Sequence, residues 1–129
     1  MNRGLNNDKL IKLSILAEKT GISVHCIRIY VDQGLVQVNA RTAGGLLLFS
    51  EPAIERLRFI KTARDVGVPL AKIVCLLTAS DNDDDQAISL SKTELNQYIH
   101  DTRGKVKAFE KSLLSFGMTD KLDNGVTQQ

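Results

Sequence analysis

The sequence contains no tryptophan, only two cysteines and only two histidines among its 129 residues, and the shortage of cysteine argues against a disulfide-rich protein. Cys26 and Cys75 each lie inside a helical pattern and do not suggest the disulfide framework of a small secreted domain. No apolar run approaches the ~20 residues that a membrane-spanning helix needs, and the polar N-terminal residues do not resemble a signal peptide. We therefore expect a cytoplasmic protein with no membrane partner.

Signatures of enzymes are equally scarce. The sequence has no glycine-rich phosphate loop, no HExxH and no nucleophile followed by a paired base. No second domain is long enough to form a cleft with the first. We expect a protein that is not an enzyme and carries no cofactor.

The charge that is present is unevenly distributed. The net charge is only +2, yet residues 1–65 carry ten basic and six acidic side chains, and the remainder carries seven basic and nine acidic ones. A basic N-terminal half is what phosphate binding requires, although many mildly basic domains bind no anion. The charge by itself leaves nucleic-acid binding open.

The segment from residue 13 to residue 36 predicts two short helices joined by a tight turn. Gly21 can adopt the positive φ that ends a helix, and Ser23 can cap the next helix by accepting a backbone N–H bond. The second helix would direct Val24 and Ile27 inward and end at Gly34. A capped helix placed across a turn from its predecessor is the geometry that enters a DNA major groove.

A hairpin and two further helices are predicted next. The apolar runs at residues 35–38 and 46–49 are separated by turn residues, as in a β-hairpin. Because successive strand residues point to opposite faces, Leu46 and Leu48 share one face and Leu47 and Phe49 the other. Ser50 is expected to cap a helix that ends near Gly67, and Pro69 opens a shorter one.

Heptad spacing marks the final helix. One series of residues falls at intervals of seven, and a second series lies four residues after members of the first. Such a helix must bury the resulting seam, either on its own head domain or on a partner. The seam consists of Leu95, Ile99, Thr102, Val106, Phe109, Leu113 and Phe116.

Taken together, these motifs resemble the MerR family of transcriptional regulators. The run V-x-x-x-I-R-x-Y-x-x-x-G-L-V that begins at Val24 matches the family's DNA-binding domain, and the similarity continues over residues 11–116. The resemblance implies a mostly α-helical fold, in which a winged helix-turn-helix head precedes a long antiparallel coiled-coil dimerisation helix. Three details are similar to the family's mercury-resistance co-regulators: S-V-H at Ser23, G-G-x-x-L-F in the wing, and an Asp-rich loop before the last helix.

The resemblance also implies a set of DNA contacts. Arg28 and Tyr30 match positions whose guanidinium and phenol contact backbone phosphates, which fix register without reading sequence. His25 and Cys26 lie on the first exposed turn, where base edges are read, although Cys26 could instead be half-buried at the rear of the helix. The complete predicted set is Lys12, Ser14, Ser23, His25, Cys26, Arg28, Tyr30, Arg41 and Gly45.

The wing and the metal ligands depart from the family pattern. The usual wing motif G-Y-R-x-Y carries an Arg where this chain has Leu47, so we expect weaker binding and a shallower salt dependence. Metal sensors of the family place Cys at both ends of the dimerisation helix, whereas this chain has Asp81–Asp85 at the start. Cys75, flanked by aliphatic residues, is expected to be buried. We therefore expect no metal site.

We expect three segments: a winged helix-turn-helix at residues 8–80, a dimerisation helix at 86–117 and a disordered tail at 118–129. The favoured function is a homodimeric regulator that binds an inverted repeat in double-stranded promoter DNA. The alternative is a co-regulator with weak DNA affinity that acts through a related MerR-type regulator or RNA polymerase. Heterodimerisation through the seam would combine both.

Overall fold

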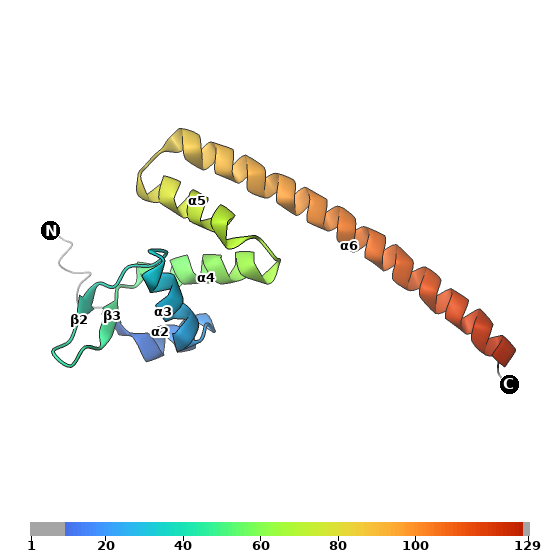
Figure 1. The fold of residues 1–129 in the computed structure, drawn as a ribbon, viewed down its shortest axis with the longest axis horizontal. Coiled ribbons are helices and arrows are strands. Elements are labelled where there is room, and N and C mark those ends of the chain that lie inside the picture. Colours follow the sequence, from blue (N-terminus) through green and yellow to red (C-terminus); the bar gives the residue numbers. More distant parts are fainter. Residues whose placement is uncertain (1–9, 128–129) are drawn as a thin grey trace. The chain divides into compact units, whose positions relative to one another are not determined.

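The structure is a computed structural model that describes the backbone of residues 10–127 and the side chains of residues 10–117. The chain divides into two compact units, a head that ends at Asp84 and a second unit that begins at Asp85. The described elements of the head, in order, are β1 (Ile11–Lys12), α2 (Leu13–Thr20), α3 (Val24–Asp32), β2 (Ala40–Arg41), β3 (Leu47–Phe49), α4 (Pro52–Asp65) and α5 (Leu70–Asp81) (Figure 1). The second unit contains α6 (Asp85–Thr127).

A small antiparallel sheet forms the wing of the head. Its strand order is β1-β3-β2, with Ile11 paired to Phe49 and Arg41 paired to Leu47. The hairpin predicted from the apolar runs is therefore present, but its first strand is β2 rather than residues 35–38. Strand β1 is an addition that no sequence pattern predicted.

The end of α3 explains why residues 35–38 are not a strand. Gly34 has a φ of 76°, and the Leu35 and Gly34 amides donate to the carbonyls of Tyr30 and Val31 at 2.9 Å and 3.0 Å. This bonding pattern is a Schellman motif, which uses the backbone of Leu35 to close the helix. Leu35 and its neighbour Val36 are buried, so their apolar character reflects core packing and not strand pairing.

The core of the head lies where α2, α3, α4 and the sheet meet. Helix α2 packs against both α3 and α4 (Figure 1). The largest fully buried side chains come from every layer of the head: Leu16, Ile27, Leu35, Val36, Phe49, Leu57, Ile60 and Ile73. On β3 the alternation is as predicted, with Leu47 and Phe49 buried and Leu48 half-buried.

The start of α4 differs from its prediction. Ser50 does not cap the helix; Glu51 occupies the N-cap position with helical dihedral angles, and no side chain accepts a capping bond there. The turn is closed by backbone bonds instead, because the Ala53 and Ile54 amides donate to the carbonyls of Ser50 and Glu51. Pro52 is the first helical residue, where its missing N–H costs nothing.

Helix α6 is longer than predicted. It begins at Asp85 and continues to Thr127, so residues 118–127, expected to be disordered, are helical, while residues 128–129 lie outside the described part. The physical reason is that the segment contains no proline and a single glycine, Gly125, which weakens a helix without ending it. The heptad seam lies within residues 95–116 of α6. Leu95 and Thr102 are half-buried, and the other five seam residues are exposed.

Candidate nucleic-acid interface

The turn between α2 and α3 is built as the sequence predicts. Gly21 adopts φ 75°, and its amide donates to the Ala17 carbonyl at 2.9 Å. The Ser23 hydroxyl accepts a hydrogen bond from the Cys26 amide at 3.1 Å, so it caps α3. Buried Thr20 adds a third constraint, because its hydroxyl donates to the Leu16 carbonyl at 2.9 Å and accepts from the Ile22 amide at 3.3 Å. The turn thus fixes the angle between α2 and α3.

Replacing Ser23 with Ala should destabilise the head by about 1 kcal/mol, because the Cys26 amide would lose its partner. Urea unfolding followed by circular dichroism would measure this change. Ser14→Ala is the matched control, since it removes the same hydroxyl from an exposed position inside α2. Equal losses for the two variants would mean that the Ser23 cap contributes nothing.

The surface of α3 separates into an inner and an outer face. Ile27 and Tyr30 are buried, whereas His25 and Arg28 are exposed and Cys26 is half-buried. The inward orientation predicted for Val24 is wrong, because this residue is 37% exposed and Ile22 from the preceding turn is buried. His25 and Arg28 are therefore exposed polar side chains of α3, together with Asp32 at the end of the helix.

Tyr30 is largely buried, which its predicted role as a DNA contact did not lead us to expect. Its side chain is only 9% exposed. Burial raises the pKa of the Tyr30 hydroxyl above its ordinary value, the neighbouring Cys26 raises it further, and Arg64 of α4 acts in the opposite direction. The phenol is accordingly neutral near pH 7. Its contact with DNA stays a prediction.

The remaining predicted contacts lie at the edges of the same head. Lys12 and Ser14 are exposed where β1 leads into α2. In the wing, Arg41 is exposed on β2, and Gly45 has a φ of 91° in the turn between β2 and β3. That turn is closed by the Gly45 amide, which donates to the Thr42 carbonyl at 2.9 Å.

Leu46 and Leu47 occupy opposite environments in the wing. Leu47, which replaces the family's wing Arg, is 6% exposed, and Leu46 is 57% exposed. Leu47 is therefore a core residue, and the wing offers apolar surface at Leu46 where the family pattern has an aromatic residue. These opposite environments agree with the prediction that Leu46 and Leu47 lie on different faces of the hairpin.

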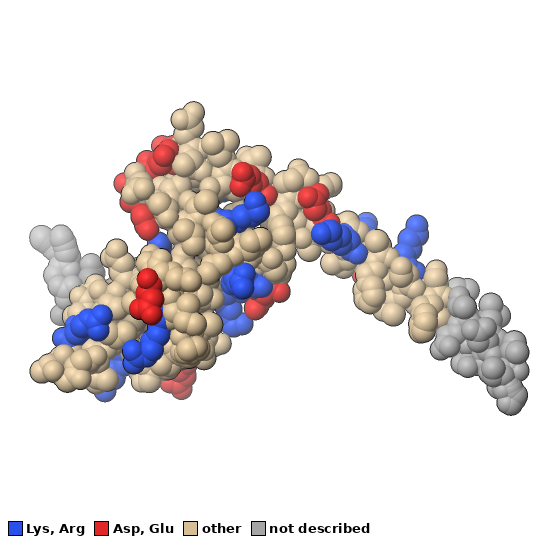
Figure 2. Space-filling model, viewed as in Figure 1, with Lys and Arg blue, Asp and Glu red and all other residues tan. Residues whose placement is uncertain are grey.

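Several basic side chains that were counted toward phosphate binding have partners within the head. Figure 2 shows Lys and Arg side chains on the face of the head, among scattered acidic ones. Arg58 donates to the Lys19 carbonyl at 3.2 Å, and Lys61 pairs with Asp65 at 3.1 Å. The Lys61–Asp65 pair lowers the net positive charge that the head offers to a ligand, while Arg58 keeps its charge but has a donor engaged by a carbonyl.

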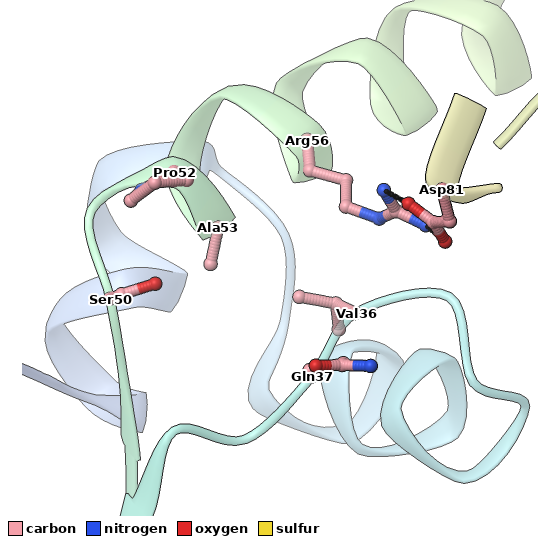
Figure 3. Close-up of a pocket in the computed structure, with 7 residues that line it drawn as sticks. All are labelled: Val36, Gln37, Ser50, Pro52, Ala53, Arg56 and Asp81. Atoms are coloured by element: carbon pink, nitrogen blue, oxygen red, sulfur yellow. Dashed lines mark hydrogen bonds and ion pairs between the residues drawn. The ribbon is translucent and has the colours of Figure 1, made fainter. Parts of the chain in front are cut away.

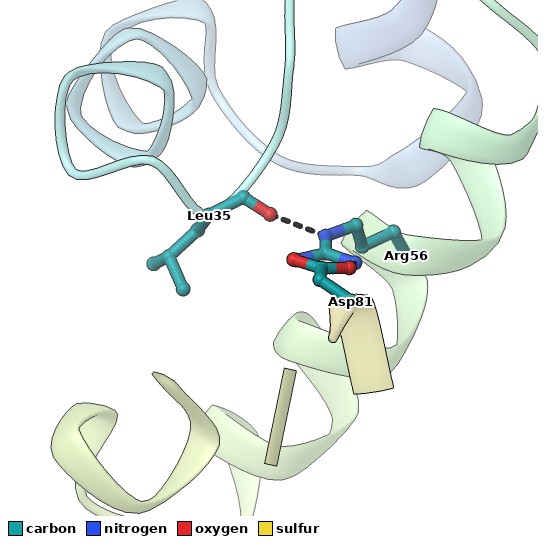
Figure 4. Close-up of polar contacts among 3 residues, drawn as sticks. All are labelled: Leu35, Arg56 and Asp81. Carbon is teal, nitrogen blue, oxygen red and sulfur yellow. Dashed lines mark hydrogen bonds and ion pairs between the residues drawn. The ribbon is translucent and has the colours of Figure 1, made fainter. Parts of the chain in front are cut away.

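Arg56 is the most firmly held of these cations. Its two terminal nitrogens each lie 2.9 Å from a different carboxylate oxygen of Asp81, and its Nε donates to the Leu35 carbonyl (Figure 4). One guanidinium thus joins α4, the end of α5 and the segment that follows α3. Sequence analysis missed this connection because the partners are 21 and 25 residues away from Arg56.

A cavity of about 360 Å³ lies beside the pair between Arg56 and Asp81 (Figure 3). Its two charged lining residues already neutralise each other, so they present no free charge to a ligand. It is lined by Val36, Gln37, Ser50, Pro52, Ala53, Arg56 and Asp81. The charged pair therefore gives the cavity no net charge with which to select an ionic ligand.

The two cysteines are free. Cys75 is exposed, contrary to the prediction that it is buried, because the inner face of α5 is formed by Ile73 and Leu77 and Cys75 lies two residues from each. Among the residues that the structure describes, no three His, Cys, Asp or Glu side chains are grouped so that they could hold a metal ion. Within the same range, no helix is long and apolar enough to cross a membrane.

Comparisons with known proteins agree with this architecture. The profile of the MerR HTH family regulatory proteins matches residues 11–80, and a second profile, described as MerR, DNA binding, matches residues 54–112. The HTH-type transcriptional regulator MerD of Acinetobacter calcoaceticus is 35% identical over 101 residues, which cover 78% of this chain and 84% of that protein. MerD of Serratia marcescens is also 35% identical, over 103 residues that cover 78% of this chain and 84% of its own length.

Solved structures show the same fold at lower identity. HiNmlR, a MerR family regulator that lacks the sensor domain and was crystallised bound to promoter DNA, superposes with a TM-score of 0.73 at 18% identity. The superposition covers 93% of this chain and 92% of that one. The similarity to MerD agrees with the subgroup predicted from the S-V-H, wing and Asp-rich details. The capped helix-turn-helix, the winged head and these matches together establish that the chain belongs to the MerR family of HTH-type transcriptional regulators.

Proposed function

We propose that this regulator binds double-stranded promoter DNA as a homodimer that recognises an inverted repeat, with one α3 helix in each major groove. The observation that carries the proposal is the capped α3, which follows the hydrogen-bonded Gly21–Ser23 turn and exposes His25 and Arg28. A capped helix that presents a cation and a polar side chain able to read a base edge on its exposed face has the features of a recognition helix.

Each predicted contact has a role that suits its chemistry. Arg28 and the Tyr30 hydroxyl bind phosphates, and His25 donates to a guanine or a phosphate. Cys26, which is half-buried and close to Tyr30, has a smaller role and touches at most a thymine methyl group. The residues that meet the sugar-phosphate backbone from the rest of the head are Lys12, Ser14, Ser23, Arg41 and Gly45.

Dimerisation supplies the second recognition helix. The seam residues Ile99, Val106, Phe109, Leu113 and Phe116 are exposed in the single chain, and a helix with a heptad seam buries it against another helix. An antiparallel coiled coil would relate the two heads by a two-fold axis, which is the symmetry of an inverted repeat.

The protein acts without a metal effector and without catalysis under this proposal. The ends of α6 lack the cysteines of metal-sensing relatives, and the matched proteins are transcriptional regulators. The regulator then modulates its promoter by its own abundance in the cytoplasm, where bacterial DNA lies. A sub-micromolar Hg(II) or Zn(II) site in the reduced protein, detected by competition with a metal chelator, would contradict this.

One observation favours a second candidate function. The wing presents exposed Leu46 and buries Leu47 at the position of the family's wing Arg, so it exchanges a phosphate contact for apolar surface. A co-regulator that binds DNA weakly and acts through a related MerR-type regulator or RNA polymerase would show this combination.

A fluorescence anisotropy titration distinguishes the two functions. The dimer, verified by light scattering, is titrated against a palindromic promoter fragment and a random duplex over a series of salt concentrations. Self-sufficient binding predicts a clear preference for the promoter fragment and a steep loss of affinity with salt. Weak binding without sequence preference would instead support the co-regulator.

A further inference from the structure

The hydroxyl of Tyr30 lies at a junction between α3 and α4. Two side chains act on it from different helices: Cys26 lies one turn before Tyr30 on α3, and Arg64 belongs to the last turn of α4. Tyr30 is buried, whereas Arg64 is exposed, so the phenol ring belongs to the core and its charged neighbour reaches solvent. Arg64 has no role in the function proposed above.

The end of α4 holds Arg64 in place. The helix closes with a Schellman motif, in which Gly67 has a φ of 87° and donates to the Arg64 carbonyl at 2.9 Å, while the Val68 amide donates to the Ala63 carbonyl at 3.0 Å. The Arg64 side chain folds back along this turn, and its Nη1 donates to the carbonyl of buried Val68 at 3.0 Å. One donor of the guanidinium is thus fixed by the turn, and the others are available to Tyr30.

Tyr30 occupies the corresponding part of α3. Its carbonyl accepts the Leu35 amide at 2.9 Å in the Schellman motif that ends this helix. Both residues therefore extend from capped helix ends, and their side chains meet between two segments whose backbones are already hydrogen-bonded. A contact built in this way needs little further ordering when the head binds a ligand.

The chemistry of the three side chains sets the direction of their hydrogen bonds. A guanidinium can only donate, so the Tyr30 oxygen accepts from Arg64 and its single proton is directed elsewhere. The pKa of Tyr30 agrees with this direction: Arg64 lowers it, as a donor that stabilises the phenolate does, and Cys26 raises it, as an acceptor that stabilises the neutral phenol does. The proton is accordingly directed toward the Cys26 sulfur, which is a weak acceptor.

A phosphate oxygen is a far better acceptor than a thiol sulfur, because it carries charge. The Tyr30 proton can therefore exchange the Cys26 sulfur for a phosphate while Arg64 keeps its bond to the hydroxyl oxygen. A hydroxyl that accepts one hydrogen bond is polarised and donates the next one more strongly. Arg64 would thereby orient and strengthen a donor without touching DNA itself.

We propose that Arg64 is a positioning residue for DNA binding, which holds the Tyr30 hydroxyl so that its proton is offered to a phosphate. The proposal rests on the Tyr30–phosphate contact of the proposed function and adds the residue that orients it.

A double-mutant cycle tests whether Arg64 acts through Tyr30. Tyr30→Phe removes the hydroxyl and keeps the buried ring, and Arg64→Met removes the guanidinium and keeps an unbranched stem. Each should weaken binding to the promoter fragment about tenfold, and the double variant should lose about tenfold as well, because both remove the same contact. Losses that multiply to about 100-fold would overturn the proposal, since Arg64 would then act independently of the hydroxyl, as a purely structural bond to Val68 would.

The salt dependence separates positioning from direct phosphate binding. A contact made by a neutral hydroxyl releases no counterion, so Arg64→Met should leave the slope of log affinity against log salt concentration unchanged. A slope that falls in magnitude by about 1 for each head would overturn the proposal in favour of a direct contact between Arg64 and phosphate. Tyr98→Phe, which removes the same hydroxyl from α6, is the control and should change neither the affinity nor the slope.

The absorbance of the phenolate tests the contact in the absence of DNA. The chain has no tryptophan and only two tyrosines, so Tyr98→Phe leaves Tyr30 as the only phenol. In this background, Arg64→Met should raise the pKa of Tyr30 further above its ordinary value, and Cys26→Ala should lower it. The titration is read over the pH range in which circular dichroism shows a folded head. An unchanged pKa after Arg64→Met would overturn the proposal.

These measurements distinguish failure of the positioning role from failure of the proposed function. If Tyr30→Phe weakened binding and Arg64→Met did not, the phosphate contact would stand and only the role of Arg64 would be overturned. If Tyr30→Phe kept full affinity, the Tyr30–phosphate contact itself would be wrong, and the positioning role would be overturned with it.

Discussion

Replacing Arg28 with Ala should lower the affinity for a promoter fragment by about 100-fold, because a symmetric dimer loses two charge-assisted contacts to phosphate. Arg28 lies on the exposed face of α3, so its removal should not disturb the core beneath. The slope of log affinity against log salt concentration should fall in magnitude by about 2, one for each lost contact. Anisotropy titrations at several salt concentrations measure both quantities.

The matched control for Arg28 is Lys107→Ala. Lys107 is an exposed cation on α6, and its removal changes the net charge equally. It should leave the DNA affinity within about threefold, as expected of a screened, distant surface charge. If the two variants lost equal affinity, binding would depend on overall charge and not on α3. If the unsubstituted protein bound the promoter fragment only weakly, and the Arg28→Ala variant still assembled with a partner regulator, the co-regulator function would be favoured.

Replacing Phe49 with Ala should destabilise the head by about 3–5 kcal/mol, the cost of truncating a fully buried aromatic side chain. Phe49 is 0% exposed, and its strand is the central one of the sheet, paired to β1 and β2. A small domain has a total stability of only about 5–15 kcal/mol, so the variant should be partly unfolded at moderate temperature. Urea unfolding monitored by circular dichroism measures the loss.

Leu46→Ala, three residues away on the same hairpin, is the control for Phe49. Leu46 is 57% exposed, so truncation should change the unfolding free energy by no more than about 0.5 kcal/mol. A large loss at Leu46, or a small one at Phe49, would mean that the wing packs differently. Leu46→Ala has a second use, since the co-regulator function predicts weaker binding to a partner protein without a change in stability.

Local features of the fold were predictable because their causes lie within a few residues. Gly21 and Ser23 define the turn through positive φ and a capping hydroxyl, and both effects act inside one helical turn. The orientation of Leu47 and Phe49 follows from the two-residue period of a strand, and it is confirmed. The family resemblance added the order of the elements.

Features that depend on distant or competing contacts were not predictable from the pattern. Strand β1 exists only because Ile11 pairs with Phe49, 38 positions further along the chain. Ser50 has the chemistry of a cap, but backbone hydrogen bonds close the turn at the start of α4 and the Ser50 hydroxyl does not cap the helix. Cys75 lies among aliphatic residues, but its angular position on α5 turns it outward. The predicted DNA contacts share one head, and their engagement with DNA stays a prediction.

The three hydrogen bonds of Arg56 limit the substitutions that this position can tolerate. A lysine at this position would keep the charge, but a single ammonium group cannot span both oxygens of Asp81 and also reach the Leu35 carbonyl, as the planar guanidinium does. The substitution usually regarded as conservative is therefore disruptive here. A tolerated exchange would have to change residues 56 and 81 together, so the two positions form one unit of mutational tolerance although they lie on different helices.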